Sequence, residues 1–404
     1  MTKWIPLSAL LVIFASQATE HRVRGLLDLR FSVSDSIESY VNGGYGKFRF
    51  NDGDQLSLAQ GTLIYNADWE NNLSVHIVAN AYMDNISDTI GLTEAYLQYK
   101  GLPSPQGFRF QLKAGMIYPK VSMENITTGW SSPYTLSYST INSWIGEEVR
   151  HNGFEASLTR LGKISGHKHD ITVSAALFQG NDPTGAMLAW HGWVQSSRQS
   201  LRHEKLPLPE LEPRFVPDAS DPFLELDNRT GYHLSANWRW HNKGRLLAGY
   251  YDNNADPTVV ENGQWAWETR FAHLGVKWQF TDNLELIAQY LKGDTLMKSG
   301  WSGNDLVYND YHSAYVMLSK KWRQQRLTVR IEEFSVTDND EINADNNQEN
   351  GEAATINYSY RLGKHWWMQI EYNWIHSDRP SRIYQGASRR LTEQQGQFAV
   401  RYFF

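Results

Sequence analysis

Segments of about ten residues in which apolar and polar side chains alternate recur along the whole chain. Near position 370, the apolar Trp366, Met368 and Ile370 alternate with the polar Gln369 and Glu371. Successive side chains of a β-strand point to opposite faces of its sheet, so each segment predicts a strand with one apolar and one polar face. The chain is therefore expected to be all-β.

The alternation predicts sixteen strands. They lie at 22–33, 56–67, 73–83, 90–100, 108–117, 153–160, 170–179, 231–241, 245–251, 268–280, 284–291, 311–321, 326–335, 352–361, 365–375 and 393–404. An even number of antiparallel strands closes into a barrel with both chain ends on the same side. Eighteen strands are the alternative, if one of the loops contains a further hairpin.

The connections between these strands alternate between short and long. The short ones are 68–72, 101–107, 161–169, 242–244, 281–283, 323–325 and 362–364. The long ones are 34–55, 84–89, 118–152, 180–230, 252–267, 292–310, 336–351 and 376–392, of which only 84–89 has few residues. This alternation is typical of transmembrane barrels, which have short periplasmic turns and longer extracellular loops.

The start of the chain has the pattern of an export signal, and its end has the pattern of a strand. Lys3 precedes the apolar run 5–14, and residues 15–18 offer a small-residue cleavage site, so 1–18 is predicted to be a signal peptide. Residues 19–404 then form the exported barrel domain. The last segment places Phe398, Val400, Tyr402 and Phe404 on one face of a strand.

Composition narrows the class of protein. The chain has no cysteine, which excludes disulfides and thiolate metal sites. Its net charge of −6 is unlike that of a basic nucleic-acid-binding protein. A mean hydropathy of −0.53 is too polar for a helical membrane protein, but a barrel exposes only alternate strand residues to lipid. The 16 Trp and 21 Tyr suit the two interfaces of a membrane.

Together, the signal peptide, the sixteen amphipathic strands and the terminal Phe404 resemble the Gram-negative outer-membrane porins, either general or phosphate-selective. The resemblance implies a water-filled channel in the outer membrane for passive diffusion of small hydrophilic solutes and ions. It also implies contact with lipid and lipopolysaccharide, and recognition of Phe404 by the barrel-assembly machinery. Small residues on the outward face of the second to fourth strands (Gly61, Ala67, Ala79, Ala81, Gly91 and Ala95) favour a homotrimer of the kind porins form.

Charged side chains on the inward face are the candidate pore lining. The basic ones in this set are Arg24, Arg30, Arg109, Lys113, Arg239, Lys277, Arg330 and Arg401. The acidic ones are Asp28 and Glu94 in strands, with Glu124, Glu147 and Glu148 in loop 118–152. Barrel closure brings the first strand beside the last, and the resemblance implies a basic wall that faces an acidic loop. The alternative is a set of solvated charges that neutralise one another.

Two long loops bear on the width of the channel. Loop 118–152 contains Trp130, Tyr134, Trp144 and Ile145, which need a surface to pack on, so we expect it to fold into the lumen and form the constriction. A cap outside the barrel is the alternative. Loop 180–230, with five prolines, is expected to cap the mouth.

Other functions find less support in the sequence. It has no Gly-x-Ser-x-Gly elbow, no His-Glu-x-x-His motif and no phosphate-binding loop, so we predict no enzymatic activity and no cofactor. The 13 His are dispersed along the chain, and no metal site is predicted. The remaining alternatives are a channel specific for an anion, sugar or oligopeptide, and a structural or adhesive barrel with a plugged lumen.

Overall fold

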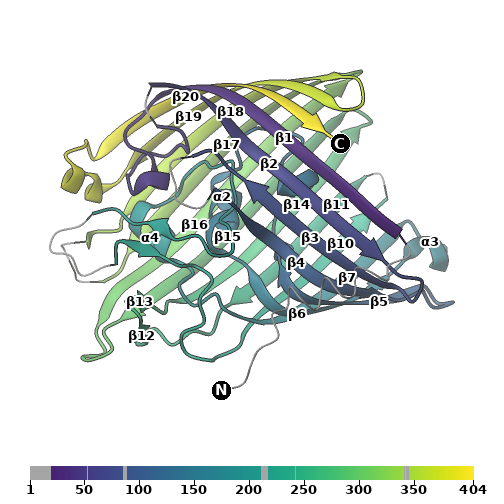
Figure 1. Ribbon diagram of the computed structural model, residues 1–404, viewed down its shortest axis with the longest axis horizontal. Helices are drawn as coiled ribbons and strands as arrows, with labels where there is room; N and C mark the ends of the chain where they lie inside the picture. Colours follow the sequence, from purple (N-terminus) through teal and green to yellow (C-terminus); the bar gives the residue numbers. More distant parts are fainter. Residues whose placement is uncertain are drawn as a thin grey trace.

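Sixteen antiparallel strands form a closed barrel in the computed structural model, which describes residues 20–51, 53–84, 89–210, 217–241, 243–340, 342 and 345–404 (Figure 1). The barrel strands are β1 (Glu20–Asp35), β2 (Gly53–Asp68), β3 (Leu73–Ala81), β4 (Ile90–Lys100), β5 (Phe108–Ile117), β6 (His151–Arg160), β7 (His169–Gln179), β10 (Gly231–Trp240), β11 (Gly244–Asp252), β14 (Glu268–Thr281), β15 (Leu284–Lys298), β16 (Asp305–Trp322), β17 (Gln325–Asp338), β18 (Glu349–Leu362), β19 (Trp366–Asp378) and β20 (Arg390–Phe403). Each strand pairs with its neighbours along this order, and β1 pairs with β20. The predicted signal peptide lies outside the described residues.

Short elements occupy the connections. They are the helices η1 (Tyr40–Asn42), η2 (Thr128–Trp130), α2 (Thr140–Glu148), α3 (Gly162–Ser165), α4 (Ala186–His191) and η4 (Pro380–Gln385), and the strands β8 (Leu206–Pro207), β9 (Ala219–Ser220), β12 (Val260–Glu261) and β13 (Gln264–Trp265). No helix in the described part of the chain is long and apolar enough to cross a membrane.

The predicted all-β barrel and its sixteen strands are confirmed. The alternative of eighteen is wrong for the described residues, since β8 with β9 and β12 with β13 form two-stranded sheets outside the barrel. The strands that differ most from their predicted bounds are β15 and β16. The end of β15 and the start of β16 are longer than predicted and pair through residues such as Thr295 and Asn309. The outward positions of these extensions include Lys292, Asp294 and Asp310, so the apolar alternation of the outer face had already ended there.

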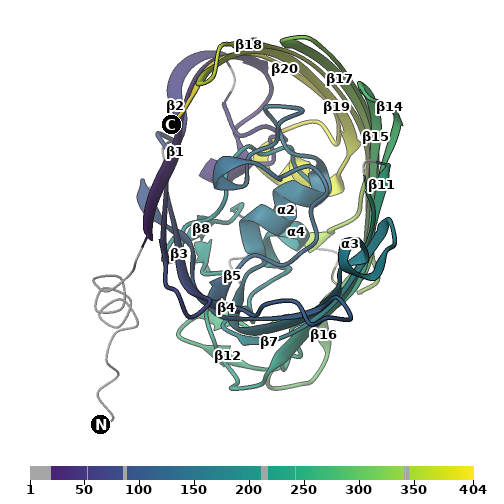
Figure 2. The same cartoon turned by 90° about the vertical axis from the view of Figure 1, so that its right-hand side faces the viewer.

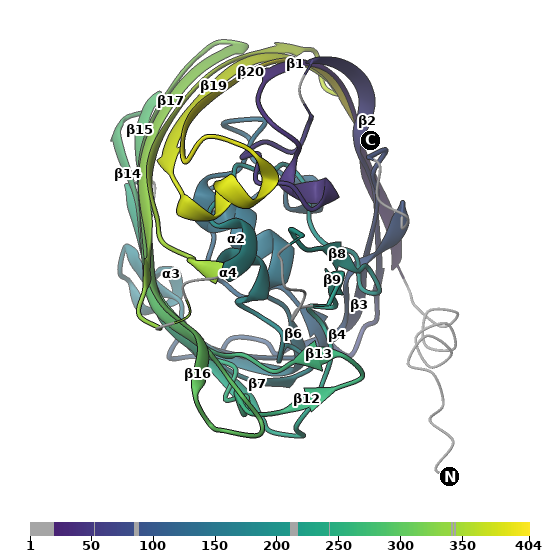
Figure 3. The same cartoon turned by 90° about the vertical axis from the view of Figure 1, so that its left-hand side faces the viewer.

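The pleat of each strand separates a largely apolar outer surface from the lumen. On β1, Val23, Leu29 and Val33 are exposed on the outside, whereas Asp28 and Arg30 point inward and are buried. Inward side chains are buried because loops fill much of the lumen, as the two end views show (Figures 2 and 3). The inward face of this barrel therefore packs against protein over much of its area.

The barrel closes through the last residue of the chain. The Gly25 N–H donates to the Phe404 carbonyl at 3.0 Å, and the Phe404 N–H donates to the Gly25 carbonyl at 3.2 Å. The Phe404 ring crosses Gly25, where a Cβ atom would lie 2.2 Å from the ring Cζ. Glycine at position 25 is thus the residue that lets the terminal aromatic ring lie flat against β1.

We expect Gly25→Ala to weaken closure, because its Cβ displaces the Phe404 ring, at a cost of about 1–3 kcal/mol. The measurement is the fraction of refolded protein that migrates as a compact barrel in unheated gel electrophoresis, against temperature. Gly396→Ala on β20 is the matched control, since an added Cβ meets no atom within 4 Å there. Equal melting of the two variants would show that the contact is unimportant.

Candidate functional site in the barrel lumen

The connection between β5 and β6, residues 118–150, lies inside the barrel (Figures 2 and 3). Its helix α2 carries Trp144, whose ring centroid is 6.0 Å from that of Trp193 in the next long loop. The same ring lies 5.3 Å from Phe271 of β14 and 5.3 Å from Tyr311 of β16. An apolar core therefore joins two loops to the inner wall, and residues 118–150 with 181–201 are called the loop plug below.

The second long loop departs from the expectation that it only caps the mouth. The Trp193 indole Nε1 donates to the carbonyl of Ser335 on β17 at 3.0 Å, and Gln195 donates to Glu332 at 2.7 Å. Part of the loop thus enters the lumen, because its apolar side chains pack with α2. The inward fold expected for the constriction loop is present.

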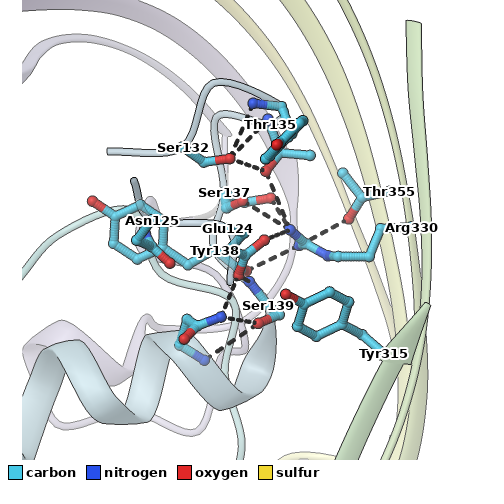
Figure 4. Close-up of polar contacts among 12 residues, drawn as sticks. Glu124, Asn125, Ser132, Thr135, Ser137, Tyr138, Ser139, Tyr315, Arg330 and Thr355 are labelled. Carbon is cyan, nitrogen blue, oxygen red and sulfur yellow. Dashed lines mark hydrogen bonds and ion pairs between the residues drawn. The ribbon is translucent and has the colours of Figure 1, made fainter. Parts of the chain in front are cut away.

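Arg330 of β17 is the main polar anchor of the loop plug (Figure 4). Its Nε donates to Glu332 at 2.7 Å, and its Nη1 pairs with Glu124 of the loop at 3.2 Å. The same guanidinium donates to the carbonyls of Ser137 at 3.0 Å and Tyr138 at 2.9 Å. The side chains of the ion-paired groups are fully buried, so two carboxylates and two carbonyls replace the water that the cation has lost.

Carboxylates on two strands of the wall, β17 and β19, fix the same loop. Glu371 of β19 accepts the backbone N–H of Leu136 at 2.6 Å and of Ser137 at 2.8 Å. Glu332 accepts the N–H of Thr140, the first residue of α2, at 2.7 Å. A carboxylate at a helix N-terminus also interacts favourably with the helix dipole. The loop backbone is therefore held by β17 and β19 together.

The expected proximity of the first and last strands is present. Asp28 lies 2.8 Å from Arg30 on the same strand and 3.1 Å from Arg401 on β20. The expected arrangement, in which Glu124, Glu147 and Glu148 oppose this cluster, does not occur. Asp28 pairs with both arginines from their own wall, while Glu124 binds Arg330.

Glu147 and Glu148 instead connect α2 with the second loop. Glu147 lies 3.2 Å from the ring of His191. Glu148 accepts hydrogen bonds from the indole of Trp144 at 2.6 Å and from the N–H of Met187 at 3.0 Å. Burial, with Glu147 as a second cause, raises the pKa of Glu148 to about 8. This carboxyl therefore titrates in the neutral range, at the contact between the two halves of the plug.

A cavity of about 510 Å³ lies between the inner wall of β1–β4 and loop residues 125–130. Arg24 is exposed to it, and its guanidinium has no ion-pair partner among the described residues. Glu94, on the same cavity, lies 3.3 Å from His76. Arg24 and Glu94 are thus the predicted lining residues that face open space in the lumen.

The other predicted lining residues lie nearer the short turns. Arg109, Lys113 and Lys277 are half-buried, and Arg239 is exposed. Lys277 pairs with Glu285 at 2.6 Å. The lining role of the whole set stays a prediction.

Sequence reasoning missed the cations that lie within the loops. Arg150, at the end of the first loop, donates to the carbonyls of Thr93 on β4 at 2.6 Å and Ser200 at 3.1 Å. Arg198 pairs with Glu204 at 2.7 Å and Asp84 at 3.0 Å. The available signal was the presence of arginines in long loops that also carry many aromatic residues.

Comparison with known proteins places this geometry among outer-membrane barrels. No profile of a known protein family matches the chain, and no curated protein matches its sequence. Among solved structures, it resembles the channel DcaP of Acinetobacter baumannii (12% identity, 95% of this chain and 97% of that chain, TM-score 0.58). It also resembles the anion-selective porin of Comamonas acidovorans (10%, 95% and 99%, TM-score 0.53) and Salmonella typhi OmpF in complex with daunomycin (11%, 95% and 97%, TM-score 0.52).

The chain has the porin fold. At these identities the likeness establishes the fold alone, and the function has to be argued from the site. The expectation that this porin-fold barrel has no enzymatic activity and no cofactor stays a prediction.

We expect Arg330→Met to release the loop plug, because the buried Glu124 and Glu332 lose their cation. Breaking a buried ion pair from one side costs about 3–5 kcal/mol. The measurement is hydrogen exchange of the backbone in residues 132–140, which should be faster than in the unchanged protein.

Arg160→Met, at an exposed end of β6, is the matched control. Adding Glu124→Gln and Glu332→Gln to Arg330→Met should restore part of the protection, since no unpaired charge then remains. Exchange in 132–140 that is unaffected by Arg330→Met would contradict the anchoring role.

The raised pKa of Glu148 predicts that docking of α2 weakens as pH rises. A free glutamate has a pKa of about 4.3, so between there and about 8 the docked form holds a proton that the released form has lost. The slope is at most about 1.4 kcal/mol per pH unit. The measurement is hydrogen-exchange protection of residues 141–149 from pH 5 to 9, corrected for intrinsic rates. Glu148→Gln should remove the slope, whereas Glu261→Gln in an exposed loop should keep it; protection that increases with pH would contradict the assignment.

Proposed function

We propose that the protein is an outer-membrane channel for small hydrophilic solutes and ions, exported through a cleaved signal peptide at residues 1–18. An apolar outer surface around a closed barrel suits insertion into lipid, where every backbone polar group needs a partner. Inward charges on many strands suit passage of polar solutes. The porin fold of the chain supports this assignment.

The observation that carries the proposal is the inward loop, held on the far wall by Arg330 and Glu371. A loop that is anchored across the lumen narrows the path for solutes, while the barrel around it keeps its full circumference. Because Asp28, Arg30 and Arg401 are buried beneath it, little of the wall near β1 and β20 is open to water. This supports a narrow channel that selects among anions, sugars or oligopeptides, rather than a wide sieve.

A second candidate is a structural or adhesive barrel whose lumen stays closed. The apolar core around Trp144, Trp193 and Tyr311 favours it, since a water-filled pore gains nothing from buried indole rings. The two candidates differ in whether solutes pass, which conductance measures directly.

We further propose that the barrel contacts lipid and lipopolysaccharide, that Phe404 is read by the barrel-assembly machinery, and that three copies associate. Small outward residues on β2–β4 support a close contact between barrels: Gly61, Ala79, Ala81 and Ala95. Gly91 does not belong to this set, because a register shift between Val78 and Ala79 pairs it with the inward Asn80. A monomeric mass of the intact protein in mild detergent would contradict the trimer.

In a planar bilayer, we expect the refolded protein to give small, stable conductance steps that close in groups of three. Arg330→Met should give larger steps because the loop plug loses its anchor, whereas Arg160→Met should not change them. The reversal potential in a salt gradient reports whether cations or anions pass more easily. Absence of conductance in both the unchanged protein and Arg330→Met, with folding verified, would overturn the channel and support the closed barrel.

A further inference from the structure

Three histidines that are far apart in the sequence converge on the inner wall of the barrel. They are His151 of β6, His233 of β10 and His273 of β14, and all three are buried. The Nε2 atoms of His233 and His273 are 3.0 Å apart. The ring centroids of His151 and His233 are 5.2 Å apart. The porin fold thus gathers three imidazoles that the sequence leaves dispersed.

These rings contain nitrogen atoms that lack a partner. In the described part of the chain, Nδ1 and Nε2 of His151 and Nδ1 of His273 are buried without a hydrogen bond. Buried polar atoms nearly always have a partner, so three orphaned nitrogens in one cluster need an explanation. A bound ion or water is the ordinary explanation for such a group.

The distance between the two facing nitrogens suits a shared metal ion. Zinc holds imidazole nitrogens at about 2.0–2.1 Å in a tetrahedron, which places two ligand nitrogens roughly 3.3 Å apart. The observed 3.0 Å between His233 and His273 needs only a small opening. As a hydrogen bond, the same contact uses one proton and leaves Nδ1 of His273 unpaired.

Neighbouring strands leave space for the rings. Position 249 of β11 is glycine, and a Cβ atom there would lie 2.3 Å from Nε2 of His273. Ala176 of β7 pairs with His233 and presents only a methyl group beside it. The His151 ring is stacked on Phe178 at 4.4 Å, which orients it within the cluster. The wall around the imidazoles is therefore formed by small residues together with the rings of Phe178, Tyr251 and Phe271.

An ion pair lies beside this cluster, because its acidic residue Glu155 pairs with Ala176, the partner of His233. Lys120 of the loop plug lies 2.9 Å from Glu155 of β6, and its side chain remains 31% exposed. Glu155 offsets the positive charge of Lys120 near the imidazoles. The partly exposed ion pair therefore borders the imidazoles on the side of the loop plug.

We propose that His233 and His273 bind a divalent transition-metal ion of the zinc class through Nε2. Neutral imidazoles suit Zn²⁺, Cu²⁺ and Ni²⁺. Two protein ligands leave the remaining positions of a tetrahedron for water or a solute. The sequence predicts no metal site, so this proposal departs from that prediction. The proposal does not depend on whether the barrel conducts ions.

The test is calorimetric titration of the refolded, chelator-treated protein with ZnCl₂, together with the visible spectrum after addition of CoCl₂. We expect one ion per chain and the strong absorption of tetrahedral Co²⁺. His233→Gln and His273→Gln should each weaken binding at least tenfold. Gly249→Ala, which keeps all three imidazoles but fills the space beside His273, should weaken it as well.

His169→Gln is the matched control, since His169 is exposed near a short turn and stacks on Trp238. It should leave affinity and spectrum unchanged. The proposal is overturned if the folded protein binds neither ion, or if the double variant His233→Gln and His273→Gln binds as tightly as the unchanged protein. Compact migration of the barrel in unheated gels verifies folding of each variant.

Discussion

Compensation of buried charge in the lumen determines how this porin-fold barrel is filled. Arg330 can be buried because Glu124, Glu332 and two loop carbonyls surround it. Without that compensation, desolvation of the guanidinium would exceed any gain from packing. The loop in turn can enter the lumen because wall carboxylates accept its backbone N–H groups. The position of the constriction therefore depends on where β17 and β19 place their charges, more than on the conformational preferences of the loop itself.

Because the lumen is filled on one side, the inward side chains of some strands pack against the loops, whereas those of other strands border a cavity. On β16, Tyr311 packs against Trp144, while Tyr315 donates to Gln289 of β15 at 2.7 Å. Inward positions thus behave as the core of a soluble protein on one side of the barrel. Near β1–β4, the same positions border a cavity and stay partly hydrated. The outer face of the strands is largely apolar, as a barrel that crosses a membrane requires.

The strands were predictable because lipid and lumen impose a period of two along the sequence, and no competing pattern interrupts it. β4 and β5 occur with the predicted bounds. The contacts inside the lumen were not predictable, since they join residues such as Glu124 and Arg330 whose separation in sequence carries no periodic signal. The meeting of Arg30 and Arg401 followed from barrel closure, but the role of Asp28 as their common partner required the actual register. The histidine cluster escaped detection for the same reason, because it depends on the registers of four strand pairs.

The two sides of the lumen differ in how strongly they hold the plug, and this bears on where solutes would pass. On the side of β17–β20, buried ion pairs and charge-assisted hydrogen bonds fix residues 132–140. On the side of β1–β4, the loop tip meets the wall through the neutral hydrogen bond from Gln60 to the carbonyl of Gly129 at 2.9 Å. A neutral hydrogen bond contributes about 0.5–1.5 kcal/mol net, whereas breaking a buried ion pair costs about 3–5 kcal/mol. Moving the loop tip away from β2 therefore requires less free energy than withdrawing residues 132–140 from Arg330, while Arg150 still holds the end of the loop at the Thr93 carbonyl of β4. For the proposed channel, a solute path beside the loop tip is the one that this difference favours.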